Sequence, residues 1–400
     1  MTYACLSKIS FGLSRKIIRE VKELPINVKQ VIIQASKNYV ELENILREYD
    51  VRSLLLVCDS AFRYLKISSY FDALENTTRV RIVKFDDFKS NPLYESVVKG
   101  VRIFRESNCD MIIAVGGGSA MDVAKCIKLY AYMDSSTIYL KQRIVPNNIT
   151  LMAVPTTAGT GSEATRYAVI YYEGEKQSVS DYSCIPSIVL MDASVLKTLP
   201  EYQKKSAMMD ALCHAIESYW SVHSNEESRG YSQKAISLIL QNMNNYLAND
   251  DKSNSIMLYA AYFAGKAINI TQTTAGHAMC YKMTSLYGIA HGHAAALCTS
   301  KLWSYMINAI DDCLEPRGKG YLEDMFAALA QVMGGNMASD GSELFDTILT
   351  GLQLHMPTPK DADFEILKNS VNQIRLKNNP VALNIETIDL LYHRILGAER

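Results

Sequence analysis

The 400-residue chain lacks three features that would place it in whole classes of protein. No apolar run reaches the ~18 residues that cross a bilayer. The N-terminus has neither the apolar core nor the small-residue cleavage site of a signal peptide. No block of lysine or arginine stands out, and 41 basic against 42 acidic residues give a net charge of -1. We therefore expect neither a membrane nor a nucleic-acid partner.

Paired cysteines are also missing. The nine cysteines form no C-x-x-C pair, and their odd number argues against a complete disulfide framework. Free thiols in a reducing compartment are the simpler interpretation, so we expect a cytoplasmic protein. The chain has no internal repeat and no low-complexity segment, and its 48% hydrophobic content over 400 residues suits two domains.

The first half of the chain alternates between β-rich apolar runs and helical patterns. Strands are expected at 54–57, 80–85, 111–115 and 149–154, and helices at 60–65, 94–106 and 120–133. This alternation predicts an α/β fold, a parallel sheet with helices on both faces.

From about Pro200 onward helical periodicity dominates and β-branched runs become rare. The periodic stretches are 206–219, 232–247, 256–270 and 322–333. We predict a boundary near 196–203, with an N-terminal extension over 1–27, an α/β domain over 28–200 and an all-helical domain over 201–400.

Two loops of small residues follow predicted strands. The first, V-G-G-G-S at 115–119, leads into a helix, where glycines let backbone N–H groups approach a phosphate. The second, at 155–163, carries four hydroxyl groups and two glycines. The G-x-G-x-x-G spacing is absent, so each loop is also compatible with a purely structural turn. Their common place at carboxyl ends of strands favours a shared ligand crevice.

Asp59 directly follows the strand at 54–57. A carboxylate in this place accepts hydrogen bonds from ribose hydroxyls and repels a 2′-phosphate, which favours NAD over NADP. The spacing supports equally well a capping role for the segment that begins at Ser60.

Four of the seven histidines fall in two dense patches. Asp210 and His214 are four residues apart in a helical pattern and so share one helix face. His277 and the H-G-H run at 291–293 follow downstream. One carboxylate and up to three imidazoles can close around a divalent ion and leave a position for a substrate oxygen.

Blander interpretations of these histidines stay open. An isolated Asp–His pair is also common at a helix surface. His293 suits a group behind the ligands, or one facing a cofactor, as well as it suits a ligand. His223, His355 and His393 have no patterned neighbours, and we assign them to structure.

Four ordered motifs resemble the iron-containing alcohol dehydrogenase family. They are GGGSAMD at 116–122, PTTAGTGSEATRYAVI at 155–170, DALCHAIESY at 210–219 and GHAMCYKMTSLYGIAHGHAAAL at 276–297. The resemblance extends over about 28–400. It implies an oxidoreductase with a dinucleotide-binding domain over 28–200, a metal- and substrate-binding domain over 201–400, and a cleft between them.

The resemblance assigns roles residue by residue. The implied metal ligands are Asp210, His214, His277 and His291. The implied cofactor contacts are Gly117, Gly118, Ser119, Asp122, Thr156, Thr157, Thr160 and Ser162, with Asp59, Asn91 and Lys176 less securely matched. The implied cofactors are NAD(H), preferred over NADP(H), and one divalent metal, Fe²⁺ by family or Zn²⁺ as the alternative.

One departure from the family pattern concerns the proton route. Many members carry a histidine four residues after the third ligand, where this chain has Tyr281. A phenol with an ordinary pKa near ~10 is a poorer acid–base group at neutral pH. His293 is the nearest substitute in the sequence, and an ordered water is an equal alternative.

A narrower resemblance concerns the substrate. RYAVIYYEGEKQSVSDYSCIP, INITQTTAGHAMCYKMTSLYG and the HGHA ending are similar to the phosphonoacetaldehyde reductases of phosphonate biosynthesis. Such a substrate needs a cation, for which Arg166, Lys176 and Lys282 are candidates, each also compatible with a surface charge or a cofactor contact.

Other functions share this plan. A generic short-chain alcohol dehydrogenase (butanol, propanediol or lactaldehyde type) and a dehydroquinate-synthase-like lyase are the alternatives, although the Asp-x-x-x-His pair argues against the lyase. A non-catalytic scaffold would have lost ligands that are all present here. The oligomeric state is not fixed by the sequence, and a homodimer is one compatible state.

Overall fold

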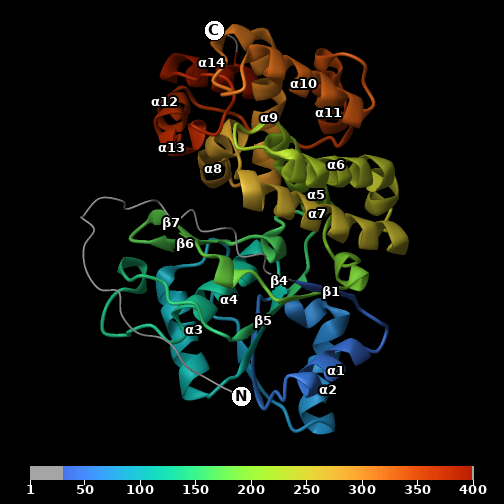
Figure 1. Cartoon of the computed structure of the whole chain (residues 1–400), viewed down its shortest axis with the longest axis vertical. Coiled ribbons are helices and arrows are strands. Elements are labelled where there is room, and N and C mark those ends of the chain that lie inside the picture. The colour runs from blue at the N-terminus through green and yellow to red at the C-terminus, as the bar shows by residue number, and fades with distance from the viewer. Residues whose placement is uncertain (1–29, 399–400) are drawn as a thin grey trace, which may run out of the picture.

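The computed structural model describes residues 30–398 as two packed parts, a sheet part and a helical part (Figure 1). The predicted extension over 1–27 lies outside the described residues. None of the helices within 30–398 combines the length and the apolarity that crossing a bilayer requires.

A six-stranded sheet forms the first part, with strand order β1-β8-β5-β4-β2-β3 and every pair parallel. The strands are β1 (Val31–Gln34), β2 (Ser53–Cys58), β3 (Arg81–Phe85), β4 (Met111–Gly116), β5 (Thr150–Pro155) and β8 (Ile188–Met191). Every residue of β2 and β4 is buried, as expected for central strands covered on both faces. The predicted fold class, a parallel-sheet domain followed by a helical domain, is confirmed.

Helices cover the sheet as the alternating pattern predicts. They are α1 (Val40–Glu48), α2 (Lys66–Thr77), α3 (Tyr94–Glu106) and α4 (Gly118–Tyr130). The segment predicted to begin a helix at Ser60 first forms the 3-10 helix η1 (Phe62–Tyr64), and α2 begins only at Lys66.

Two features of this part were not expected from the pattern. The short strands β1 and β8 pair with each other at the sheet edge, 157 residues apart in sequence at Val31 and Ile188. An antiparallel hairpin, β6 (Tyr167–Tyr172) and β7 (Glu175–Ser180), forms a separate two-stranded sheet that packs against α4. Its turn residues Glu173 and Gly174 both have positive φ, at 51° and 81°, as in the turns that match strand twist.

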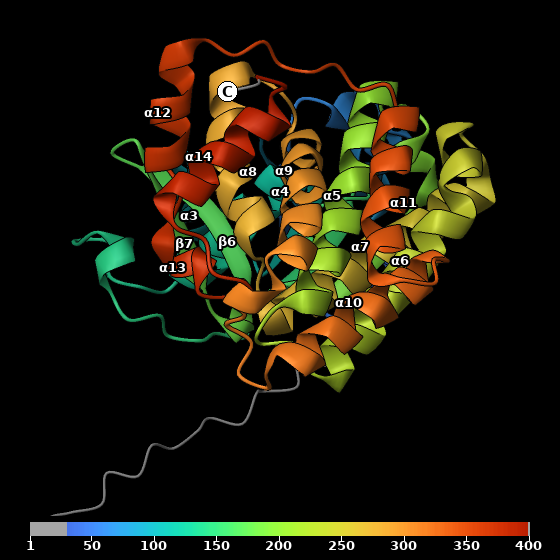
Figure 2. The same ribbon diagram turned by 90° about the horizontal axis from the view of Figure 1, so that it is seen from above.

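The second part is helical throughout. Its helices are α5 (Glu201–Trp220), α6 (Glu226–Leu247), α7 (Asp251–Thr271), α8 (Ala275–Tyr287), α9 (His291–Asn308), α10 (Lys319–Met333), α11 (Ala338–Gly351), α12 (Asp361–Asn369), α13 (Gln373–Leu376) and α14 (Ile385–Ile395). Figure 2 shows α5 and α9 next to each other in the middle of this part. The α5 helix is buried along most of its length, with the indole of Trp220 packed against Trp303 and Phe326.

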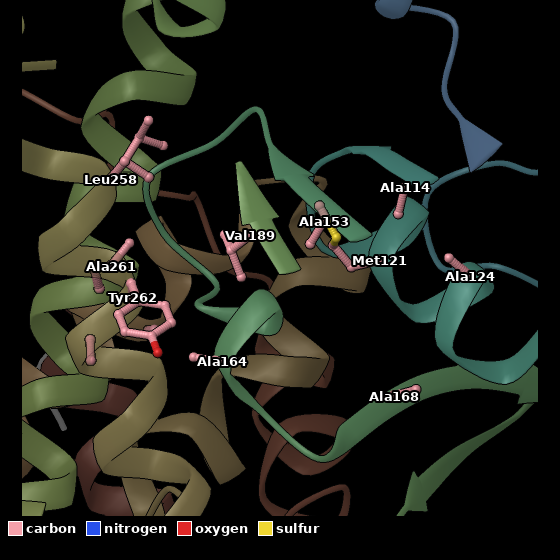
Figure 3. Close-up of a cluster of buried hydrophobic side chains, with 14 of the residues drawn as sticks. Ala114, Met121, Ala124, Ala153, Ala164, Ala168, Val189, Leu258, Ala261 and Tyr262 are labelled. Carbon is pink, nitrogen blue, oxygen red and sulfur yellow. The ribbon is translucent and has the colours of Figure 1, made fainter. Parts of the chain in front are cut away.

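Helix α7 joins the two parts through an apolar contact. Leu258, Ala261 and Tyr262 of α7 face Ala164 and Val189 of the sheet part (Figure 3). The backbones meet at Gly161 and Gly265, where an added Cβ on Gly161 would lie 2.6 Å from the Gly265 Cα. This close packing fixes the helical part against the carboxyl ends of the strands.

Candidate metal and cofactor site

Three helices bring one carboxylate and three imidazoles together. Asp210 and His214 lie one turn apart on α5, His277 is in the first turn of α8, and His291 begins α9. The Oδ1 atom of Asp210 is 3.4 Å from His277 Nε2 and 4.0 Å from the Nε2 atoms of His214 and His291. The His214 and His277 rings stack with centroids 4.4 Å apart. The structure thus places the four predicted ligands side by side.

Two glycines next to the ligands allow this approach. A Cβ on Gly292 would lie 2.0 Å from a backbone oxygen of α5 and 2.6 Å from the Asp210 Cβ. A Cβ on Gly276 would lie 2.7 Å from Oε1 of Glu217. Helices α8 and α9 can therefore pack against α5 only because these positions have no side chain.

Glu217 is a residue of this site that the sequence reading missed. It is fully buried, and its Oε1 accepts a 2.5 Å hydrogen bond from His277 Nδ1. The other oxygen accepts from the backbone N–H and the hydroxyl of Thr274, both at 2.7 Å. The bond to Nδ1 fixes the ring so that Nε2 faces Asp210. Glu217 lies seven residues after Asp210 on α5, a spacing that puts both side chains on one helix face and could have identified Glu217 from the sequence.

Burial and charge act in opposite directions on these groups. Burial lowers the pKa of His214 to about 4 and that of His291 to about 3, against the attraction of Asp210. For His277, burial also lowers the pKa, but Glu217 and Asp210 outweigh it and raise the pKa to about 9. Burial raises the pKa of Asp210, but its interactions with His214, His277 and His291 outweigh burial and hold that pKa well below its usual range. An ionised carboxylate facing two neutral imidazoles is the state that binds a metal.

The donor set fits a divalent transition metal. Asp210, His277 and His291 have ligand atoms within 4.8 Å of one another. Ligands about 2.1 Å from a common ion in tetrahedral geometry are about 3.4 Å apart, close to the 3.4–4.0 Å distances measured from Asp210. Nδ1 of His277 is held by Glu217, which leaves Nε2 on the side of Asp210. Imidazole and carboxylate together suit Fe²⁺ and Zn²⁺.

The predicted cofactor residues gather at the carboxyl ends of β2, β4 and β5. Gly117 lies against Thr157, and Gly118 against Thr160, at 3.4 Å and 3.1 Å from where a Cβ would be. Ser119 and Thr156 are half-buried in the same two loops. One carboxylate oxygen of Asp59 caps the Ala61 N–H at 2.9 Å, while the other lies near Gly116. The capping role and the place beside the glycine loop therefore both hold for Asp59.

The hydroxyl loop also touches the helix that carries the ligands. A Cβ on Gly159 would lie 2.8–3.0 Å from Ala207, three residues before Asp210 on α5. The loop at 155–163 thus connects the sheet edge to the candidate metal ligands.

Two predicted cofactor residues have partners within the protein. Asp122 accepts hydrogen bonds from the Ser162 hydroxyl at 3.1 Å and from the Val169 N–H at 3.1 Å. The buried Lys125 donates to both the hydroxyl and the carbonyl of Ser162. Burial raises the pKa of Asp122 to about 6, with Lys125 opposing. These contacts give Asp122 and Ser162 a role in fixing the loop. Asn91 is exposed, with a positive φ of 57°, in the turn before α3.

The two proton-relay candidates lie in different surroundings. Tyr281 stacks on His291 with an interplanar angle of 17°, and burial raises its pKa to about 12. His293 is fully buried, with Nδ1 3.1 Å from the Tyr202 hydroxyl and its ring near His355. Tyr281, not His293, is the one in contact with a candidate ligand.

The three predicted cationic residues also lie in different surroundings. The guanidinium of Arg166 donates to the Tyr182 hydroxyl at 2.5 Å and to the Asn269 carbonyl at 2.8 Å, so it is already held by the fold. Lys282 is half-buried on α8. Lys176, with its Nζ 3.1 Å from the Tyr281 ring centroid, lies beside the site together with Arg375, which the sequence reading did not single out.

Comparison with known proteins supports the same interpretation. Residues 30–193 match the model for "Iron-containing alcohol dehydrogenase", and residues 205–396 match the model for the C-terminal part of the "Fe-containing alcohol dehydrogenase family". The chain therefore belongs to the iron-containing alcohol dehydrogenase family, and it is an oxidoreductase of the alcohol dehydrogenase type.

Individual relatives differ in what they act on. Phosphonoacetaldehyde reductase of Streptomyces viridochromogenes is 30% identical over 319 residues, which are 76% of this chain and 79% of that protein. Aldehyde-alcohol dehydrogenase 2 of Entamoeba histolytica is 30% identical over 288 residues, 67% of this chain, and the chain spans only 33% of that longer protein.

Solved structures share the fold. The crystal structure of sulfoacetaldehyde reductase from Bifidobacterium kashiwanohense, in complex with NAD+, superposes with a TM-score of 0.81 at 23% identity, covering 92% of this chain and 98% of that one.

Proposed function

We propose that the protein reduces a small aldehyde to a primary alcohol with a nicotinamide cofactor and a divalent metal held by Asp210, His214, His277 and His291. The observation that carries this proposal is the single Asp210 oxygen within 4.0 Å of three imidazole Nε2 atoms. When bound there, a divalent cation supplies Lewis-acid polarisation of a carbonyl group.

The chain's own residues position the other participants. The loops at 116–119 and 155–163 hold the cofactor's pyrophosphate, and the Gly159–Ala207 contact directs that cofactor toward α5. Glu217 keeps Nε2 of His277 facing the ligand cluster. Tyr281 is the proposed proton donor, because a phenol, even with its pKa at about 12, can protonate the still more basic alkoxide.

The finer assignment is the reduction of phosphonoacetaldehyde to 2-hydroxyethylphosphonate with NADH and Fe²⁺. The 30% identical phosphonoacetaldehyde reductase supports the substrate. Asp59 supports NADH, since its charge repels a 2′-phosphate. Four protein ligands exceed the three of a typical catalytic zinc site, which supports iron. A generic short-chain alcohol dehydrogenase is the alternative, and the cytoplasmic location and the homodimer stay predictions.

A spectrophotometric screen tests this proposal. Iron-loaded protein is mixed with NADH and either phosphonoacetaldehyde or neutral aldehydes of two to four carbons, and NADH oxidation is followed. His277→Ala should abolish metal binding and turnover, whereas His223→Ala, which removes an exposed imidazole from the same part, should retain both. A His277→Ala variant that reduces aldehydes at the wild-type rate in the presence of a chelator would refute the metal mechanism.

A further inference from the structure

Two cations from distant segments converge on one aromatic ring beside the candidate metal ligands. Lys176 on β7 places Nζ 3.1 Å from the centroid of the Tyr281 ring, and Arg375 on α13 places its Cζ 5.3 Å from the same centroid. The Tyr281 ring stacks on His291, with centroids 5.4 Å apart. Both positive charges therefore contact the aromatic ring that stacks on the candidate ligand His291.

Neither cation is neutralised by the fold. Within residues 30–398, no carboxylate makes an ion pair with Lys176 or Arg375, and Nζ of Lys176 has no hydrogen-bond partner. Within 30–398, Arg375 donates one hydrogen bond, to the Thr273 hydroxyl at 3.2 Å, so most of its five N–H groups have no acceptor among these residues. Burial lowers the pKa of Lys176 to about 7, and the nearby Arg375 adds to the lowering.

Three other buried lysines differ from Lys176 because their ammonium groups donate hydrogen bonds to oxygen atoms of the protein. Lys125 donates to five oxygen acceptors, and Lys128 and Lys204 donate to three each. The fold thus satisfies buried ammonium groups where they serve structure. Among the described residues, Lys176 has no such oxygen acceptor and Arg375 has only the Thr273 hydroxyl, so both charges are available to an anionic ligand.

We propose that Lys176 and Arg375 bind the acidic group of the substrate, and that the protein selects short aldehydes that carry a tetrahedral oxyanion. This inference rests on the proposed aldehyde reduction. The Tyr281 ring contacts both cations and also stacks on His291, so an anion held by the two cations lies beside the ligand cluster. The guanidinium fork binds two oxygens of the anion, and the ammonium, as a point charge, binds the third.

Arg375 separates this role from cofactor binding. The family resemblance matches Lys176 to a cofactor contact, so a loss at Lys176 alone has two explanations. Arg375 comes from the C-terminal helical part, outside the sheet part that carries the cofactor loops. Its effect should therefore appear in the KM of the acidic aldehyde and not in that of NADH.

The test compares acidic and neutral aldehydes in the metal-loaded enzyme. Arg375→Gln should lower kcat/KM for phosphonoacetaldehyde by about 30-fold, the range expected for losing a charged hydrogen bond, with a change below about threefold for propionaldehyde. Arg375→Lys should recover part of the loss. Lys377→Gln, which removes an exposed cation two residues away, is the matched control and should change neither ratio.

Three acidic substrates identify the anion. Phosphonoacetaldehyde, sulfoacetaldehyde and malonate semialdehyde carry a dianionic tetrahedral, a monoanionic tetrahedral and a planar acid group. We expect the wild-type preference in that order, and the loss in Arg375→Gln to be largest for the phosphonate. Equal losses on acidic and neutral aldehydes, or a rise confined to the KM of NADH, would overturn the proposal.

A binding measurement makes the result independent of turnover. Calorimetric titration of the metal-free protein with 2-hydroxyethylphosphonate should give a Kd that Arg375→Gln raises by about 30-fold and Lys377→Gln leaves unchanged. Thermal unfolding of each variant checks its fold, and Arg375→Lys serves if Arg375→Gln does not fold. If the enzyme reduces neutral aldehydes but Arg375→Gln does not change kcat/KM for acidic ones, this inference is refuted and the proposed function stands. If the wild-type protein reduces no aldehyde at all, the proposed function itself is refuted.

Discussion

Replacing Glu217 with glutamine tests whether a carboxylate outside the ligand set controls the metal site. Glutamine keeps the size of the side chain but removes its charge and turns one oxygen into an N–H donor. Both oxygens of Glu217 now accept hydrogen bonds, from His277 on one side and Thr274 on the other. The new N–H group must therefore face the Thr274 N–H or shift the His277 proton to Nε2, the nitrogen that faces Asp210. Losing one hydrogen bond to a charged group in a fully buried place costs about 1.5–3 kcal/mol.

The loss should appear mainly in metal affinity. Because the Glu217 bond sets the tautomer of His277, we expect Glu217→Gln to weaken Fe²⁺ and Zn²⁺ binding by about 10–100-fold. Chelator-competition titrations with a metal-sensitive dye measure this directly, and circular dichroism reports whether the fold persists.

Glu315→Gln is the matched control for this variant. Glu315 is also buried and charge-paired, but its partner is Arg317, so this variant should lower the unfolding temperature without changing metal affinity. An unchanged metal Kd in Glu217→Gln, or an equal change in Glu315→Gln, would show that Glu217 only supports the fold.

Three further outcomes follow from the geometry. Asp59→Ser should reduce the preference for NADH over NADPH by roughly fivefold, the worth of about 1 kcal/mol of charge repulsion, as measured by the ratio of kcat/KM values. Metal binding should release about one proton below pH 9, because the raised pKa of His277 keeps Nε2 protonated in the metal-free protein. Metal affinity should therefore rise with pH and level off above about pH 9. Calorimetry in buffers of different ionisation enthalpy measures the number of protons released. Gly292→Ala should displace His291 and abolish metal binding, since the new Cβ would lie 2.0 Å from a backbone oxygen. The control Gly230→Ala, in open space on α6, should raise the free energy of unfolding in urea by about 0.5–1 kcal/mol. Wild-type metal affinity in Gly292→Ala would contradict the packing argument.

Local patterns were enough to predict most of the architecture. The predicted strands at 54–57, 111–115 and 149–154 lie within one residue of β2, β4 and β5, because a central parallel strand reads as a continuous apolar run. The edge strand β1 and its neighbour β8 were missed, since each has only four residues and the two pair across a long stretch of sequence.

For the site, the sequence by itself determined the chemistry: which residues can bind a metal, and which loops can bind a phosphate. The sequence predicts that Asp210 and His214 share one helix face, because helical spacing is a local property. Only the tertiary structure decided how these groups meet. The buried carboxylate of Glu217, the close approach at Gly292 and the convergence of Lys176 with Arg375 depend on contacts between segments 60 to 200 residues apart, and no local pattern encodes those contacts.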